Sequence, residues 1–316
     1  MAFARVLRLR RSTAAARVPG LRAGVVKAAE TALDLDPSSG VAYIALNHLQ
    51  PWGRYAERED LVMKALATAP RDPQILTEVG IHLSLAGRNR DCMVYAAQAY
   101  ALDPLLPETA TVYVTALAMT GDRQDARAAL DTLRARLPDH ASLMNTALWG
   151  AVEDNDWERF DALVQEASER QFGAPVVAET IAAAEMIRHP KPEDREFMLN
   201  ALSSQLERTG TVNLGSLIHA ARIELVEEAF DFVEKASFEH MFDETGRMPA
   251  GRSYGHGIVL LPGSNRAMID DIRFVGLCAK LGLCDYWVKT DKWPDIAVDL
   301  PLNYDFKAEA RRLVAA

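Results

Sequence analysis

Residues 73–106 read PQILTEVGIHLSLAGRNRDCMVYAAQAYALDPLL, and residues 107–140 read PETATVYVTALAMTGDRQDARAALDTLRARLPDH. The two stretches have the same length, with Gly87 and Gly121 at the fifteenth position and Pro104 and Pro138 at the thirty-second. Apolar residues recur every three or four positions in both halves of each stretch, which is the spacing of one face of a helix. A unit of 34 residues built in this way predicts two antiparallel helices joined by a tight turn.

The same period continues on both sides of these two units. Prolines recur at Pro37, Pro70, Pro104 and Pro138, and turn residues at Gly53, Gly87, Gly121 and Asn155. Glycine or asparagine supplies the left-handed backbone that ends a first helix, and proline stops the second. The small residues Ala65 and Ala99 allow the two helices of a hairpin to approach closely. Residues 25–174 are therefore expected to form half a unit, with its second helix at Val25–Leu35, and four units at 39–72, 73–106, 107–140 and 141–174.

This period and its turn residues resemble the tetratricopeptide repeat family over residues 39–174. The bulky aromatic residue often found early in the first helix of that family is replaced by Ala42, Leu76, Ala110 and Met144. The resemblance implies an all-α fold, a right-handed superhelical α-α solenoid of helical hairpins.

Beyond residue 174 the step of 34 fades, but helical hairpins of degenerate sequence are expected to fill residues 175–240. Apolar residues at three- and four-residue intervals predict helices at 174–188, 193–208, 214–222 and 225–235. Glycines and prolines between residues 241 and 266 predict a long irregular loop. A helix at 268–281, ended by Gly282, and a C-terminal cap then complete the segment 241–316.

In the tetratricopeptide repeat family the first helix of each hairpin lines a concave groove, and the resemblance carries these groove positions to a defined set of residues. They are Tyr43, Asn47, Gln50, Gln74, Thr77, Glu78, Glu108, Thr111, Thr115, Ser142, Asn145, Thr146 and Trp149. The set holds no lysine or arginine, so a grip on a partner's terminal carboxylate is not expected. Amides and hydroxyls suit an extended peptide backbone, with Tyr43 and Trp149 as aromatic anchors. In the alternative interpretation these side chains only solvate the face or contact the next helix.

Aromatic residues gather near the C-terminus at Tyr286, Trp287 and Trp293. The run from Arg273 through Gly282 to Trp293 resembles the end of a group of bacterial repeat proteins, although it departs from them at Ile296–Ala297. In that group the solenoid is commonly fused behind a winged-helix DNA-binding domain or a nucleotide-cyclase domain, so the resemblance implies a regulatory role. We expect the three aromatic residues to cap the apolar end of the last hairpin, with contact to a ligand as the alternative.

Composition excludes several classes of protein. The net charge of −9 opposes direct binding of nucleic acid. Three scattered cysteines, Cys92, Cys278 and Cys284, indicate reduced thiols in a cytoplasmic protein and no disulfide framework. No run of some 18 apolar residues free of charge occurs, so no membrane-spanning helix is expected.

The N-terminal residues 1–24 are basic and contain no acidic residue. We interpret them as disordered, or as the remnant of a preceding domain or of an upstream start, rather than as a transit-like peptide. The half unit that follows lacks a complete hairpin, and its uncovered face predicts self-association into a homo-oligomer as one arrangement of the chain.

One stretch matches a catalytic motif. Gly251–Gly255 reads GRSYG, the pattern of a nucleophile elbow, and His256 follows it. That motif needs a strand-to-helix turn and a later histidine, and no histidine follows His256, so a hydrolase centred on Ser253 is the less favoured reading. The spacing of the seven histidines predicts no metal site, and no phosphate-binding glycine loop is present, so no cofactor is expected.

The sequence therefore favours a non-enzymatic scaffold that binds a protein or peptide of unknown identity, and that serves as a regulatory module. A small-molecule sensor is the alternative, in which the loop at 242–264 folds against Tyr286 and Trp287 to enclose an apolar pocket.

Overall fold

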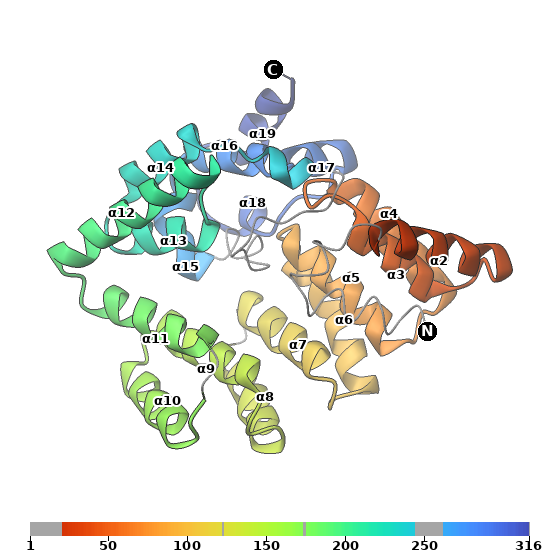
Figure 1. The fold of residues 1–316 in the computed structure, drawn as a ribbon, viewed down its shortest axis with the longest axis horizontal. Helices are drawn as coiled ribbons and strands as arrows, with labels where there is room; N and C mark the ends of the chain where they lie inside the picture. Colours follow the sequence, from red (N-terminus) through yellow and green to blue (C-terminus); the bar gives the residue numbers. More distant parts are fainter. Residues whose placement is uncertain (1–20, 122, 173–174, 244–261, 316) are drawn as a thin grey trace.

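The computed structural model describes residues 21–121, 123–172, 175–243 and 262–315, and these form helices and connecting turns (Figure 1). The first helices are α2 (Leu21–Leu35), α3 (Gly40–Leu49), α4 (Tyr55–Thr68), α5 (Pro73–Leu85), α6 (Asn89–Leu102), α7 (Pro107–Met119), α8 (Arg123–Arg136), α9 (Ala141–Glu153) and α10 (Trp157–Glu169). They are followed by α11 (Pro175–Arg188), α12 (Pro192–Thr209), α13 (Leu214–Arg222), α14 (Val226–Lys235), η2 (Glu239–Phe242), α15 (Pro262–Ile269), α16 (Arg273–Lys280), α17 (Leu283–Thr290), α18 (Ile296–Asp299) and α19 (Phe306–Ala315). The predicted all-α class is confirmed, whereas the superhelical twist stays a prediction.

The helical hairpins follow the period of the sequence. The second helices α4, α6, α8 and α10 begin at Tyr55, Asn89, Arg123 and Trp157, each 34 residues after the last. The first helix α11 begins at Pro175, so the step continues one helix beyond the four units expected. Helix α2 begins at Leu21, four residues before the expected start of the half unit.

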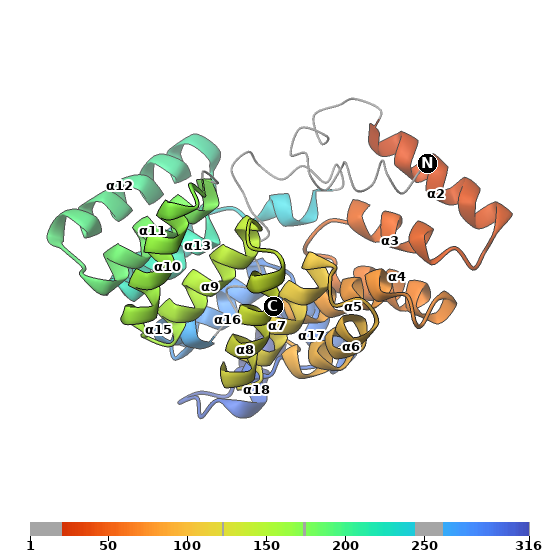
Figure 2. The ribbon, with the colours of Figure 1, turned by 90° about the horizontal axis from the view of Figure 1, so that it is seen from below.

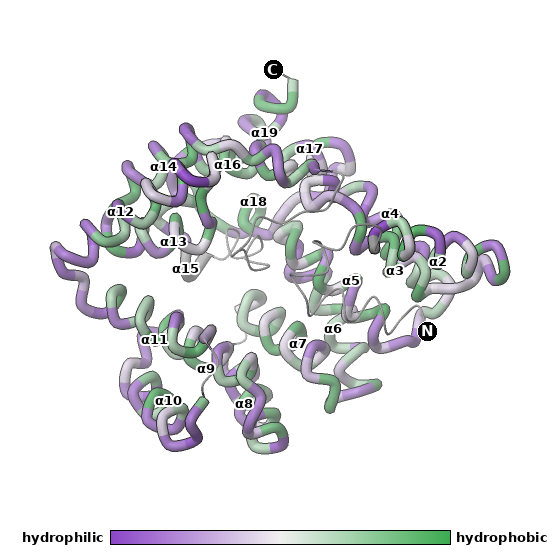
Figure 3. Tube along the Cα trace, viewed as in Figure 1, coloured by the Kyte–Doolittle hydropathy of each residue, from purple (hydrophilic) through white to green (hydrophobic). Residues whose placement is uncertain are grey.

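Small and medium side chains occupy the contact between the two helices of each hairpin. Ala65 and Ala99 are both 0% exposed, as expected from their places before the prolines. Residues at the position that is often aromatic in tetratricopeptide repeats are likewise buried, and they are Ala42, Leu76, Ala110 and Met144. Hydrophobic and hydrophilic residues are interspersed along the helices (Figure 3), because each helix buries one face and solvates the other.

Three of the four predicted turn residues adopt the left-handed backbone, namely Gly87, Gly121 and Asn155. The prediction for Gly53 is wrong, because its φ is not positive. Gly53 instead lies in close contact with the 3-10 helix η2: a Cβ at this position would require the ring of Phe242 to shift, and the N–H of Gly53 donates to the carbonyl oxygen of Met241 at 2.7 Å.

The C-terminal third differs from the sequence prediction in one element. The single helix expected at 268–281 is two helices, α15 and α16, separated by a break at residues 270–272. Asp271 explains the break, because its carboxylate accepts a hydrogen bond from the backbone N–H of Arg273 at 2.8 Å and so starts a new helix there. Gly282 ends α16 in the left-handed conformation, as predicted.

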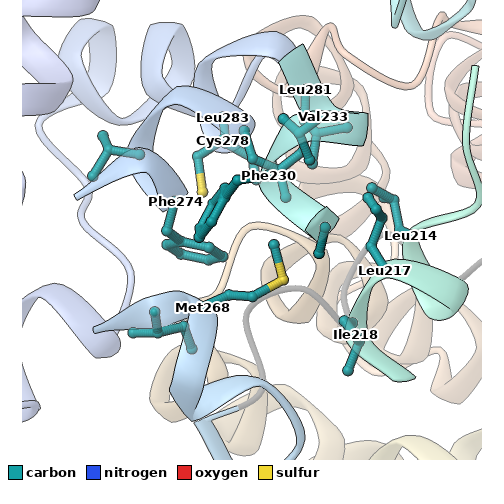
Figure 4. Packing of buried hydrophobic residues seen from close by; sticks show 14 of the residues in the cluster. Leu214, Leu217, Ile218, Phe230, Val233, Met268, Phe274, Cys278, Leu281 and Leu283 are labelled. Atoms are coloured by element: carbon teal, nitrogen blue, oxygen red, sulfur yellow. The ribbon is translucent and has the colours of Figure 1, made fainter. Parts of the chain in front are cut away.

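The largest hydrophobic core joins the last hairpins to the C-terminal segment. Figure 4 shows Phe230 of α14 beside Phe274 and Cys278 of α16, with Met268 of α15 below them. The same cluster also includes Tyr55 and Leu85, residues of the first two repeats. The C-terminal segment therefore does more than cap the last hairpin: it packs against the start of the repeat array as well.

This packing closes the helices into a ring, in which α17 meets α4 (Figure 1). Figure 2 shows α2 and α12 at opposite edges of the molecule, with the C-terminal helices between them. Trp287 is 0% exposed and donates from Nε1 to the carbonyl oxygen of Ala86 at 2.9 Å. Asp295 donates its backbone N–H to Gly87 at 2.9 Å, so the C-terminal segment binds the turn of the second repeat directly.

Charged and polar side chains reinforce the same junction. Glu59 lies between two cations, Arg88 at 2.9 Å and Lys292 at 3.1 Å. Arg88 also donates to the hydroxyl oxygen of Tyr286 at 2.7 Å, and Tyr286 is 1% exposed. Because Glu59 and Arg88 belong to the first two repeats, these contacts fix the C-terminal segment to the opposite end of the array.

His82 lies inside the junction, 1% exposed, and neither of its ring nitrogens has a hydrogen-bond partner among the described residues. Its ring lies 6.4 Å from that of Tyr55 and 6.2 Å from that of Tyr286. Burial, together with the positive charges of Arg58, Arg88 and Lys292, lowers the pKa of His82 to about 3. The imidazole is therefore neutral at neutral pH, and protonation opposes closure of the ring.

Among the residues that the structure describes, no helix has both the length and the apolar character needed to cross a membrane.

The close approach of two glycines gives a test of the junction. A Cβ on Gly282, whose φ is +83°, would collide with the backbone of Gly53, whereas a Cβ on Gly210, whose φ is +67°, meets nothing within 4 Å. Gly210→Ala is expected to cost roughly 1–2 kcal/mol through its backbone conformation alone. Gly282→Ala is expected to cost about 1–3 kcal/mol more, because the collision is added. Urea unfolding of both variants measures the difference, and equal losses would contradict the contact.

The burial of His82 predicts acid sensitivity. The unfolded chain takes up a proton near the ordinary histidine pKa of 6.5, but the folded chain does so only near 3, so stability falls as the pH drops below 6.5. At pH 5 this linkage costs about 2 kcal/mol. His82→Phe is expected to remove that loss, as seen by comparing urea unfolding at pH 7 and pH 5. The same exchange at the exposed His189 is the control, and an unchanged pH dependence in His82→Phe would refute the linkage.

Candidate functional site

A pocket of about 240 Å³ lies where α7, α8 and α9 meet α13. The helices α7, α9 and α13 each present one face to the pocket, since the lining residues of each recur three and four positions apart. From α7 come Thr115, Ala118 and Met119, from α9 come Thr146, Trp149, Gly150 and Glu153, and from α13 come Ile218, His219 and Arg222. The pocket is therefore shared between the third and fourth repeats and the degenerate hairpin that begins with α13.

The depth of the pocket is apolar. Its buried lining residues come from α7, α8, α9 and α13 and are Val114, Ala126, Leu130, Ala147, Ala151 and Ile218. Thr115, Thr146, Trp149 and His219 are half-buried and carry the polar groups. An apolar interior with a few polar groups is the usual composition of a ligand or side-chain binding site.

Two contacts join α9 to α13 beside the pocket. The rings of Trp149 and His219 are stacked, with centroids 5.3 Å apart and planes inclined by 23°. One turn further along both helices, Arg222 Nη1 donates to Glu153 Oε1 at 2.6 Å, and both side chains are largely buried. These contacts join α13 to α9, although α10, α11 and α12 separate them in the sequence.

His219 is neutral at neutral pH. Burial, and secondarily the charge of Arg222, lowers its pKa to about 4. Neither ring nitrogen forms a hydrogen bond with the described residues, so the neutral imidazole has one donor and one acceptor that no described side chain uses.

The arginines of the lining are neutralised by carboxylates. Asp154 accepts from Arg123 at 2.6 Å and from Arg127 at 3.0 Å, and Arg127 also lies 3.0 Å from Asp156. Arg159 pairs with Asp131 at 2.7 Å, and Arg222 with Glu153. The rim of the pocket is therefore polar without a net positive field.

Four of the predicted groove residues line this pocket, and they are Thr115, Asn145, Thr146 and Trp149. Asn145 already accepts a hydrogen bond from Thr180 at 2.5 Å, and Thr146 donates to the carbonyl of Ser142 at 2.9 Å. Four of the seven groove positions predicted in the third and fourth units thus line one pocket, whereas Glu108, Thr111 and Ser142 do not.

The other predicted groove residues lie elsewhere. Asn47, Thr77 and Glu78 are 1%, 3% and 8% exposed, with Thr77 hydrogen-bonded to Thr109 at 2.6 Å and Glu78 lying 3.3 Å from His48. Tyr43, Gln50 and Thr111 are half-buried, and Gln74, Glu108 and Ser142 are exposed. In the first two units, several side chains that the resemblance assigned to the groove are thus buried in contacts between neighbouring helices.

The C-terminal aromatic residues are structural. Tyr286 and Trp287 are enclosed in the junction, and Trp293 is half-buried, with Lys307 and Arg311 over its ring at 5.3 and 5.0 Å. Ser253 and His256, like most of the loop at 242–264, lie outside the described residues. Among the residues described, no three histidine, cysteine or acidic side chains gather as a metal site would require.

Sequence reasoning missed the contribution of α13. Ile218, His219 and Arg222 share one helix face, but the 34-residue period had faded before α13, and no spacing related it to α9. The one feature of the sequence that pointed to a role for α13 was the spacing of His219 and Arg222, three residues apart on one face of a short amphipathic helix.

Models of known protein families and curated protein sequences were both compared with this chain, and none of them matches it.

Proposed function

We propose that this chain is a non-enzymatic, tetratricopeptide-like scaffold that binds a protein or peptide segment on the inner face of its third and fourth repeats. One observation carries the proposal: residues assigned to the concave groove from sequence, Thr115, Asn145, Thr146 and Trp149, line one pocket. A groove with a single apolar pocket and surrounding hydroxyls and amides suits an extended segment that inserts one side chain.

The charges near the pocket support an internal segment as the partner, rather than a chain terminus. Recognition of a terminal carboxylate needs arginine or lysine with free hydrogen-bonding capacity. The arginines of this lining already pair with carboxylates, Arg123 and Arg127 with Asp154 and Arg222 with Glu153. A carboxylate ligand would have to displace one of these pairs.

The resemblance of the C-terminal segment suggests the cellular setting of the scaffold. We propose a regulatory module of a bacterial signalling or transcription protein that acts in the cytoplasm, on the resemblance of its C-terminal segment to such proteins. The buried, free thiols Cys92, Cys278 and Cys284 are in keeping with a reducing compartment.

The alternative function, a small-molecule sensor with its pocket at Tyr286 and Trp287, has less structural support. It requires the rings of Tyr286 and Trp287 to face a ligand, but these rings are 1% and 0% exposed and contact the first two repeats. Protein atoms thus already occupy the space that a ligand would need around them.

Affinity capture from a lysate of the source organism tests the proposal. Trp149→Ala removes a wall of the pocket, and Trp157→Ala removes a half-buried tryptophan of α10 that packs on Phe160 and lies outside the lining. Wild type and Trp157→Ala are expected to retain the same partner, and Trp149→Ala to lose at least 90% of it. Circular dichroism establishes that both variants are folded.

Equal retention by Trp149→Ala would show that the partner binds elsewhere on the chain. Turnover of an ester or peptide substrate that is abolished by Ser253→Ala would instead replace the scaffold with an enzyme.

A further inference from the structure

We propose that the pocket between α7, α8, α9 and α13 receives an uncharged aromatic side chain of the partner, an indole or a phenol, with its polar edge toward Thr115 and His219. This inference rests on the proposed function, and it specifies the chemistry that the scaffold recognises.

The size of the pocket fits such a ring. An apolar cavity of about 150 Å³ is large enough to hold benzene. The pocket here measures about 240 Å³, which allows a phenol or a bicyclic indole. Trp149 and the thioether of Met119 line it, and both make favourable contacts with aromatic rings.

Gly150 leaves this space open. It lies in the interior of α9, where glycine costs about 0.5–1 kcal/mol relative to alanine. Its φ is not positive, and an added Cβ would meet nothing within 4 Å, so neither backbone conformation nor packing demands glycine. Gly150 is exposed and lines the pocket, so the missing side chain leaves the margin of the pocket open to an occupant.

Two polar groups at the half-buried margin have unused hydrogen-bonding capacity. Thr111 and Thr146 each donate to the carbonyl oxygen four residues back, at 2.8 and 2.9 Å, but the Thr115 hydroxyl makes no such bond within the described part of the chain. His219 likewise has no protein partner for its ring nitrogens there. A phenol O–H can donate to one of these groups and accept from the other, and an indole N–H can donate to one of them, whereas a wholly aliphatic side chain offers neither group a partner.

Charge balance selects a neutral ring. Each arginine of the lining lies within 3.0 Å of a carboxylate, so no net positive charge remains to hold an acid. A cation is equally disfavoured, because Asp154 and Glu153 are already engaged by arginines.

Direct titration with side-chain analogues tests the inference. The probes are indole and p-cresol, with toluene as the ring without a polar edge and indole-3-acetate as the charged ring. Binding is measured from shifts of the Leu130 and Ile218 methyl signals in a methyl-labelled full chain. We expect indole and p-cresol to shift both residues, and indole-3-acetate to bind at least tenfold more weakly than indole.

Two variants locate the binding. Gly150→Leu places a large side chain at the open margin of the pocket and is expected to weaken the binding of indole at least tenfold. Gly24→Leu, at an exposed glycine of α2 that also has open space, should leave indole binding unchanged. Thr115→Val is expected to weaken the binding of p-cresol severalfold and to leave the binding of toluene unchanged, because it removes only the hydroxyl. Absence of probe binding, or binding unchanged in Gly150→Leu, would overturn the inference.

Capture of the partner by the same variants separates this inference from the proposed function. Loss of the partner from Gly150→Leu and retention by Gly24→Leu supports both. Retention by Gly150→Leu would overturn the aromatic anchor and leave the scaffold intact. Probe binding without capture of any protein would overturn the scaffold and assign the pocket to a free aromatic molecule.

Discussion

The contact between Gly53 and Gly282 is the constraint on which the rest of the structure depends. At this point the turn of the first repeat and the start of α17 approach so closely that a Cβ on Gly282 would collide with the backbone of Gly53. In the same junction Trp287 is buried and donates to Ala86, and Glu59 pairs with Arg88 and Lys292. In the same ring α13 lies against α9, where Trp149 stacks on His219 and Arg222 pairs with Glu153. The junction and the pocket are thus two contacts between helices that lie far apart in the sequence.

Much of the fold could be predicted from local sequence, because a repeat is a local pattern. The spacing of Pro70, Pro104 and Pro138 and of the turn glycines located the hairpins to within a few residues. Ring closure could not be predicted in this way. Gly53 has the same place in its unit as Gly87, but only Gly53 is in contact with Phe242 and Met241, nearly 190 residues away. A periodic sequence contains no sign of which repeat a distant segment will bind.

The candidate site was predictable in part for the same reason. Thr115, Asn145, Thr146 and Trp149 follow from the repeat register, since equivalent positions of stacked hairpins share one face. The same register assigned Asn47 and Glu78 to the groove, yet both are buried. His219 and Arg222 come from a helix outside the period, and they reach the pocket through tertiary contacts with α9 that a local pattern does not encode.

Amide hydrogen exchange at Gly53 and Asp295 tests ring closure most directly. Neither amide belongs to a helix; each donates across the junction, from Gly53 to Met241 at 2.7 Å and from Asp295 to Gly87 at 2.9 Å. In a closed ring both amides exchange only when the junction opens, so their protection should match that of the buried helix α17 and fall together in Gly282→Ala. Exchange of both amides at the rate of solvated turns, with α17 still protected, would show that the array is open and would contradict the account.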